Sequence, residues 1–273
     1  MSFPFFLRLA YVGTNFFGWQ IQTVLRSVQG EFWKALQTLD PEAPMPQGTG
    51  RTDAGVHARA QGVLALTARD WDPYRLLAAL NAHLPGDVRV MTAEAAPTGF
   101  FPRHHAVAKR YVYKLQEGPA ADPFLLDRAW HQYGKEPLDR KAMAQAAAHL
   151  VGEHDFSSFR AAECSAKTAV RIIFKVGLMD RGPALDLVFE GNRFLMHQVR
   201  IMTGTLVDVG RGRESPDSIA AILAERDRRR SGISAPAHGL YMDKVWYQSR
   251  WGIGDPSPWP EPPEGHQALG CGL

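Results

Sequence analysis

The stretch Gln47-Gly-Thr-Gly-Arg-Thr-Asp-Ala-Gly-Val-His57 is the most unusual part of this 273-residue sequence. It combines three glycines with an Arg51-Thr52-Asp53 triplet, between two segments of regular pattern. Glycine accepts positive φ angles and lets a ligand approach the backbone closely. From these residues alone, two interpretations stay open. The stretch is a tight loop in which Asp53 caps a turn, or a loop that offers its polar side chains to a ligand.

Alternating strand and helix patterns surround this loop in the first half of the chain. Ser27 is a candidate N-cap, and apolar residues recur at helical spacing from it to Leu39. Asp72-Pro73 is a capping residue followed by proline, a pattern that opens a second helix. We expect strands at Phe5–Val12, Gly62–Thr67 and Asp87–Ala93.

The second half of the chain repeats this mixture. Helices are expected at Asp139–Leu150, at Arg193–Val209 and after Ser215-Pro216. Strands are expected at Val107–Gln116 and Leu240–Tyr247, with a hairpin of Thr168–Met179 and Ala184–Glu190. The pattern predicts an α+β fold of two similar lobes, residues 1–105 and 106–250. A proline-rich tail, residues 251–273, is expected to be extended.

Composition and charge exclude several classes of protein. Hydrophobic residues make up 45% and charged residues 22%, which excludes disorder as the main state. A net charge of +3 is too small to indicate a nucleic-acid partner by itself. Cys164 and Cys271 are too few for a disulfide framework or a Cys-rich zinc site. Because we find no signal peptide and no apolar run of about 20 residues, we expect a soluble, cytoplasmic protein without a membrane partner.

Familiar cofactor and metal motifs are missing from the sequence. No Gly-Lys-Ser/Thr closes the 47–57 loop as it would a P-loop, and its glycine spacing does not fit a dinucleotide fingerprint. No His-Glu-x-x-His, Cys-x-x-Cys or Gly-x-Ser-x-Gly pattern occurs. His104-His105 and the pair His149 and His154 lack matching Cys or carboxylate residues, so we interpret them as surface or core histidines. The sequence therefore predicts no metal site.

Basic residues adjoin aromatic residues in a way that suits RNA. Arg103 and Lys109-Arg110 bracket the start of the strand that carries Tyr111 and Tyr113 on one face. Two further basic clusters are Arg193, His197 and Arg200 on one predicted helix, and the run 225–230. In RNA-binding proteins, arginines hold phosphates and rings stack on exposed bases. For each cluster alone, a solvated face or a core tyrosine is the alternative.

At this point the stretch Gly50-Arg-Thr-Asp-Ala-Gly-Val-His57 becomes decisive, because it resembles the catalytic motif of the tRNA pseudouridine synthase A family. The resemblance extends to about Tyr247 and leaves out the proline-rich tail. It is also carried, in the family's order, by Tyr11, Gly18-Trp19-Gln20, Ser27-Val-Gln29, Asn81, Leu84-Pro-Gly86, Phe101–Tyr113, Gly152–Arg160 and Phe194–Arg200. One departure is Arg59, which stands where relatives often have small residues.

The resemblance implies an isomerase that converts uridine to pseudouridine at positions 38, 39 and 40 in the anticodon stem-loop of tRNA. It implies no organic cofactor, no required metal and no DNA partner. It also implies two ferredoxin-like lobes with antiparallel sheets, joined around a central RNA-binding cleft, in a homodimer. Two alternatives stay open: a non-catalytic RNA-binding protein on the same fold, and a synthase of the same superfamily that acts on other uridines.

The resemblance selects Asp53 as the catalytic carboxylate, and leaves open whether it attacks the sugar, attacks the base or removes a sugar proton. A cation must keep such a carboxylate ionised in an enclosed site. Arg200 is a candidate by resemblance, and Arg51 by its closeness in sequence. A uridine in a stem must be flipped out to react. We expect Arg103 to fill the vacated space and Tyr111 to stack on the flipped base.

Overall fold

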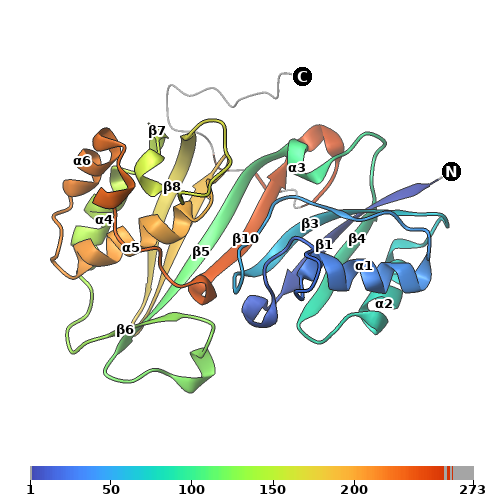
Figure 1. Ribbon diagram of the computed structural model, residues 1–273, viewed down its shortest axis with the longest axis horizontal. Helices are drawn as coiled ribbons and strands as arrows, with labels where there is room; N and C mark the ends of the chain where they lie inside the picture. Colours follow the sequence, from blue (N-terminus) through green and yellow to red (C-terminus); the bar gives the residue numbers. More distant parts are fainter. Residues whose placement is uncertain (1, 255–256, 259, 261–273) are drawn as a thin grey trace. The chain divides into compact units, whose positions relative to one another are not determined.

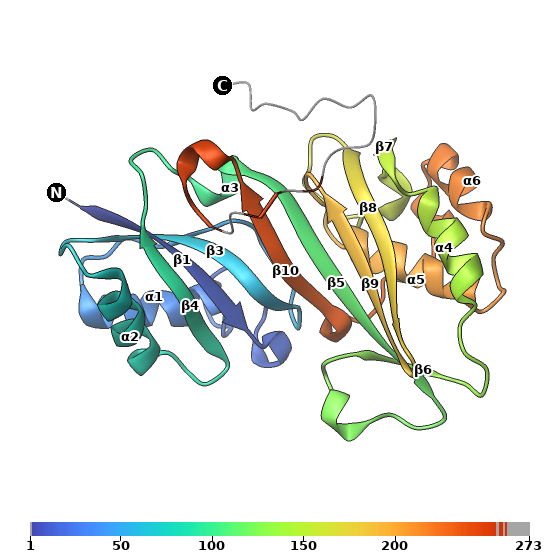
Figure 2. The ribbon, with the colours of Figure 1, turned by 180° about the vertical axis from the view of Figure 1, so that it is seen from behind.

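The computed structural model describes residues 2–254, 257–258 and 260, which divide into two units (Figures 1 and 2). Unit 1 contains the described residues of 1–107 and 241–259, and unit 2 contains residues 108–240 and residue 260. This division differs from the expected break at residue 105 with all of 106–250 in the second lobe. The reason is that strand β10 (Leu240–Tyr247) pairs in parallel with β3 (His57–Thr67), a strand of unit 1.

Unit 1 is a mostly antiparallel sheet covered on one face by two helices. Its strands run in the order β4-β1-β3-β10, with β2 paired to β3. Helices α1 and α2 pack side by side over this sheet (Figure 1). The remaining bounds are β1 (Phe3–Tyr11), α1 (Val28–Leu39), β2 (Gln47–Gly48), α2 (Pro73–His83), β4 (Val88–Ala95) and α3 (Pro102–His105).

Helices α1 and α2 begin where the sequence predicts. The Ser27 hydroxyl accepts a hydrogen bond from Gly30 N at 3.2 Å at the start of α1. The Asp72 carboxylate accepts one from Arg75 N at 2.9 Å at the start of α2, with Pro73 in the first helical position. Each cap satisfies one of the backbone N–H groups that the first helical turn leaves without a partner.

Strand β3 begins five residues earlier than expected, at His57 rather than at Gly62. Its first part pairs with β1, where Tyr11 lies opposite Ala58 and Leu9 opposite Gln61. The sequence of this part contains polar residues and so does not resemble a buried strand. It forms a strand because it pairs with β1, which is distant in the chain. The glycine-rich loop therefore leads directly into a long strand.

The strands of unit 2 run in the order β5-β9-β8-β7, with β6 paired in parallel to β5. The expected hairpin is confirmed, since Arg181 of β8 lies opposite Ala184 of β9. Helices α4 and α5 pack against each other. The bounds are β5 (Ala106–Gly118), β6 (Trp130–Tyr133), α4 (Arg140–Ala148), β7 (Gly152–Asp155), β8 (Val170–Arg181), β9 (Ala184–Gly191), α5 (Gln198–Gly210) and α6 (Ser218–Glu225).

Helix α5 corrects one expectation, because it begins at Gln198 and not at Arg193. His197 precedes it in a left-handed conformation with φ 60°, which an α-helix does not contain. The Gln198 side chain accepts a hydrogen bond from Leu195 N at 2.8 Å, so the preceding residues form a turn. Arg193 and His197 therefore do not share a helical face with Arg200.

Three further expectations concern membrane helices, the two cysteines and the proline-rich tail. Among the described residues, no helix is long and apolar enough to cross a membrane. Cys164 is a free thiol, whereas Cys271 lies outside the described residues, as does most of the expected tail. The start of that tail is ordered in unit 1, because the Trp251 ring stacks on His105 at 4.3 Å between centroids.

Candidate active site

Asp53 lies half-buried in the loop of residues 49–56, which joins β2 to β3. Hydrogen bonds to β3 hold the first residues of this loop. Thr49 donates from its backbone N and its hydroxyl to Gly62 O, at 2.8 and 3.1 Å. The Gln61 side chain donates to Gly50 O at 2.6 Å. The segment that leads to Asp53 is therefore held against the strand that follows it.

Thr52, the residue before Asp53, is buried and held from two sides. Its hydroxyl lies 2.8 Å from the hydroxyl of Tyr11, at the end of β1. Its carbonyl oxygen accepts a hydrogen bond from Trp19 N at 3.1 Å. Burial raises the pKa of Tyr11 well above its usual value, so this phenol stays protonated. These contacts fix the backbone from which the Asp53 side chain projects.

Two glycines let the segment after β1 approach the Asp53 loop closely. A Cβ atom on Gly18 would lie 2.5 Å from the Thr52 carbonyl oxygen, and Gly18 also has φ +88°. A Cβ atom on Gly13 would lie 2.0 Å from the Val56 carbonyl oxygen. Both distances are shorter than any side chain allows. Only glycine fits at these two positions, because any side chain there would collide with the backbone of the Asp53 loop.

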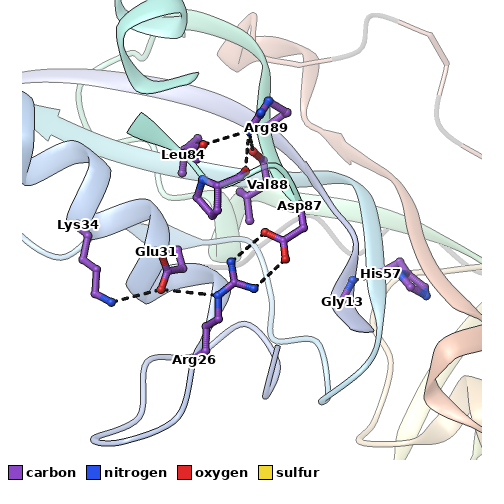
Figure 3. Close-up of polar contacts among 10 residues, drawn as sticks. Gly13, Arg26, Glu31, Lys34, His57, Leu84, Asp87, Val88 and Arg89 are labelled. Carbon is purple, nitrogen blue, oxygen red and sulfur yellow. Dashed lines mark hydrogen bonds and ion pairs between the residues drawn. The ribbon is translucent and has the colours of Figure 1, made fainter. Parts of the chain in front are cut away.

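An ion pair secures the segment that leads from Gly18 to α1, as Figure 3 shows. Arg26 donates two hydrogen bonds to the Asp87 carboxylate, at 2.7 and 2.9 Å. These bonds hold the pKa of Asp87 below its usual value. The Arg26 guanidinium also lies 4.1 Å above the centre of the Phe16 ring, and Phe16 O accepts a hydrogen bond from Gly55 N. The ion pair therefore supports the Asp53 loop indirectly.

His57 ends the loop and lies buried at the start of β3. Its Nδ1 accepts a hydrogen bond from Gly13 N at 3.0 Å (Figure 3). Because Nδ1 is the acceptor, the neutral ring carries its proton on Nε2. The ring stacks on Tyr241 of β10, with 4.6 Å between centroids. His57 is thus bonded and stacked within unit 1 as a structural residue.

The two other candidate residues of unit 1 are exposed arginines. Arg51 lies in the loop two residues before Asp53, and Arg103 lies in the short helix α3. Their exposure gives both guanidinium groups access to solvent, and hence to a polyanionic ligand. Unit 1 therefore carries three of the five candidate residues.

Tyr111 and Arg200 lie in unit 2. Tyr111 is buried on β5, opposite Phe189, and its ring meets the ring of Phe194 edge to face at 5.1 Å. Arg200 is half-buried on α5, and its Nε donates to Ala235 O at 2.7 Å. This bond fixes the plane of the guanidinium group.

The second tyrosine of the pair, Tyr113, is fully buried in the core. Its hydroxyl donates a hydrogen bond to Pro236 O at 2.7 Å. Burial raises the pKa of this hydroxyl, and the positive charge of Arg200 opposes that rise. Tyr113 therefore has a structural role on the same strand as Tyr111.

The histidines considered as metal ligands have other partners. His149 Nε2 lies 3.3 Å from an Asp217 carboxylate oxygen, and His154 is hydrogen-bonded to Val151 O. The part of the chain that the structure describes contains no group of three His, Cys, Asp or Glu residues suited to a metal ion.

No pattern in the sequence predicts the bond between Tyr11 and Thr52 or the ion pair of Arg26 with Asp87. Each joins residues that are more than 40 positions apart in the chain. Tyr11 entered only through the family resemblance. Its place at the end of a buried strand was the one signal of a bonded hydroxyl, because a buried phenol usually finds a hydrogen-bond partner.

Comparison with known proteins finds one matching family model and similar proteins that cover most of the chain. A family model described as tRNA pseudouridine synthase matches residues 9–102 and 146–248. The tRNA pseudouridine synthase A of Azorhizobium caulinodans is 43% identical over 242 residues, which cover 88% of this chain and 93% of that protein. Those of Pelobacter propionicus and Myxococcus xanthus are each 40% identical, over 88% and 89% of this chain and 98% and 91% of their own lengths.

The matched segments include the Asp53 loop and Arg200. Arg103 and Tyr111 fall between the two segments of the family model. The similarity to the relatives thus extends over most of both units.

Proposed function

The chain belongs to the tRNA pseudouridine synthase family, and on this premise we propose that Asp53 is the carboxylate with which it converts uridine to pseudouridine. The protein is an isomerase that acts on uridines of tRNA. The family match over the Asp53 loop carries this conclusion. We further propose that the target uridines are those at positions 38, 39 and 40 of the anticodon stem-loop.

The reaction rearranges one nucleotide without a change in its atoms. The bond from C1′ to N1 of uracil breaks, the base turns, and a bond from C1′ to C5 forms. The C5 proton leaves, and N1 gains a proton. In the proposal, Asp53 assists as a nucleophile or a base, and either role requires an ionised and well-placed carboxylate. The bonds that hold Thr49, Gly50 and Thr52 support that placement.

Two arginines are proposed to keep Asp53 ionised. Arg51 is two residues away in the same loop. Arg200 is oriented by the bond from its Nε to Ala235 O. A positive charge within a few ångströms of a carboxylate favours its ionised form. The proposal requires residues of both units to reach one uridine.

Base flipping is the second requirement, because a uridine in a stem is stacked and paired. Extrusion costs a few kcal/mol. Arg103 is proposed to occupy the space that the base leaves, and its exposed position on α3 supports this role. Tyr111 is proposed to stack on the flipped uracil, a contact worth about 1–3 kcal/mol. Its buried, edge-to-face packing on Phe194 keeps the ring rigid for this task.

The fold proposal is two ferredoxin-like lobes around a cleft that binds RNA, in a homodimer of the cytoplasm. In unit 1, the antiparallel order β4-β1-β3 with α1 and α2 in the connections supports a ferredoxin-like lobe. In unit 2, the order β5-β9-β8 with helices on the sheet supports a similar arrangement.

Pseudouridine mapping on an unmodified tRNA transcript tests the function. After incubation with the protein, we expect pseudouridine at positions 38 to 40 and at no other uridine. Product at other positions would assign the protein to a synthase with another target. Tight binding of tRNA without any product would instead support a non-catalytic RNA-binding protein.

A further inference from the structure

Unit 1 contains a cavity of about 260 Å³ that the proposed reaction does not use. Its lining comes from β1, β3 and β10, and from Gly254 beyond β10. Pockets that enclose a drug-sized molecule have volumes of about 300–1,000 Å³. This cavity is smaller, so it suits a single small group better than a whole nucleotide.

This lining contains more cationic than anionic side chains. It includes Arg8, Arg59 and Lys244, against one carboxylate, that of Asp243. The Arg59 guanidinium lies 3.8 Å from the Asp243 carboxylate, a distance too long for a hydrogen bond. Its N–H groups therefore keep their capacity to donate. The Arg59 side chain is 60% exposed, so a ligand can reach it from solvent.

Arg8 gives the cavity an unsatisfied donor. Its neighbours Leu7 and Leu9 are fully buried, and successive strand residues point to opposite faces, so Arg8 points away from the core beneath them. Within the described part of the chain, its Nε is buried without a hydrogen-bond partner. Glu94 interacts with Arg8 electrostatically and accepts a hydrogen bond from Gly254 N at 3.0 Å. A buried cationic donor without an acceptor is unfavourable, which points to an acceptor supplied by a ligand.

Residues that line the cavity also contact the Asp53 loop. Tyr247 lines the cavity, and its hydroxyl lies 2.5 Å from the hydroxyl of Thr49, the first residue of the loop. On the other side, the Arg59 guanidinium lies 5.7 Å from the centre of the Tyr241 ring, which stacks on His57 at the end of the loop. The lining is therefore in contact with the start of the loop at Thr49 and is linked through Tyr241 to His57 at its end.

We propose that this cavity binds one phosphate of the tRNA backbone, beside the nucleotide that reacts. This inference rests on the proposed function, since tRNA is the ligand that brings phosphates to the Asp53 loop. The planar guanidinium groups of Arg8 and Arg59 match the geometry of phosphate oxygens. The size of the cavity favours one phosphate, and the exposed Arg59 favours a phosphate that belongs to a larger molecule.

The test measures the affinity of the protein for tRNA and the dependence of this affinity on salt concentration. Arg59→Gln removes an exposed charge from the cavity, and Arg75→Gln removes one from the exposed surface of α2 as a matched control. Binding of a tRNA transcript is measured over a range of KCl concentrations. We expect Arg59→Gln to raise Kd about tenfold and to lower the slope of log K against log salt by about 1, the result of losing one phosphate contact. Arg75→Gln should change neither quantity.

Phosphate ethylation interference then locates the contact. With the wild-type protein, ethylation of one particular phosphate should prevent binding, and with Arg59→Gln that phosphate should drop out of the pattern. In steady-state kinetics, Arg59→Gln should raise KM more than it lowers kcat. Lys244→Gln, a second variant at the cavity, should weaken binding in the same direction.

Unchanged Kd, salt slope and interference pattern in both cavity variants would overturn the proposal. Binding of radiolabelled inorganic phosphate that Arg59→Gln abolishes, with tRNA affinity unchanged, would also overturn it, because the cavity would then be a site for free phosphate. These outcomes differ from a failure of the proposed function, in which the wild-type protein binds tRNA and forms no pseudouridine.

Discussion

The hydroxyl groups of Tyr11 and Thr52 lie 2.8 Å apart, although 41 positions separate the two residues in the chain. Both side chains are buried, so no water replaces this bond if it is lost. It joins the end of β1 to the residue before Asp53. The position of the proposed catalytic carboxylate thus depends on a bond made by the first strand of the protein.

Tyr11→Phe should slow catalysis and destabilise the protein. The change leaves the Thr52 hydroxyl buried without this partner, which costs about 1–3 kcal/mol of unfolding free energy. Misplacement of Asp53 should lower kcat by between about tenfold and a hundredfold. Chemical denaturation and steady-state kinetics measure the two effects. Tyr74→Phe, at an exposed tyrosine of α2, is the control and should alter neither. A destabilised Tyr11→Phe protein with wild-type kcat would show that catalysis does not need the bond.

The two tyrosines of β5 should respond differently to the loss of their hydroxyls. Tyr111→Phe keeps the ring, so tRNA should bind normally. We expect turnover to fall about 10²–10⁴-fold, the usual contribution of a general acid or base, because the C5 proton must be removed while Asp53 is engaged. Tyr111→Ala should lose affinity as well. Tyr113→Phe should leave activity nearly unchanged and lower stability by about 1–3 kcal/mol, since Pro236 O loses its donor. Equal losses of activity in the two Phe variants would contradict this assignment.

The ion pair of Arg26 with Asp87 should make stability depend on acidic pH. The pKa of Asp87 is lowered in the folded protein, chiefly by its hydrogen bonds with Arg26. The stabilisation is therefore fully present above the unfolded pKa of an aspartate, about 3.9, and is lost as pH falls through the lower folded value. Asp87→Asn should reduce the unfolding free energy by about 1 kcal/mol at neutral pH, because the pair is partly exposed.

Denaturation of wild type and Asp87→Asn over a range of pH checks this expectation. The difference should shrink towards zero on acidification below the usual aspartate range. Asp70→Asn, at an exposed aspartate, is the control and should show no such dependence. A difference that stays constant across the acidic range would mean that packing, not the charge of Asp87, stabilises this segment.

Activity should not require a metal ion bound to the protein. The family resemblance implies none, and His149 and His154 have partners within the fold. Activity on pre-folded tRNA should survive prolonged EDTA treatment followed by desalting. Pre-folding matters because Mg²⁺ also folds the RNA. Loss of activity that added zinc restores would contradict the prediction.

The sequence predicted best what neighbouring residues decide. The starts of α1 and α2 follow from Ser27 and Asp72, whose caps are made to backbone groups three residues away. The early start of β3 and the place of β10 in unit 1 depend on pairing between Tyr241 and His57, which no local pattern reveals. The start of α5 was missed because a left-handed conformation is uncommon for a residue such as His197.

In the candidate site, too, the sequence predicted features set by neighbouring residues and did not predict contacts between distant segments. Glycines and the Arg-Thr-Asp triplet marked the loop of Asp53 from the sequence, basic and aromatic clusters marked Arg103, Tyr111 and Arg200, and the family resemblance supplied the roles of these three residues. The contacts that hold the loop in place, from Tyr11 and Gln61, were not predicted. They join separate strands, so they follow from the tertiary fold rather than from any short stretch of sequence.

Asp53→Asn tests whether Asp53 is the catalytic carboxylate. The substitution keeps the shape of the side chain and removes its charge and nucleophilicity. The measurement is the release of tritium from C5-labelled uridine in tRNA, with tRNA affinity measured in parallel and Asp70→Asn as the control. We expect no release above background by Asp53→Asn, with tRNA affinity close to that of the wild type. Substantial turnover by this variant would contradict the assignment of Asp53 as the catalytic residue.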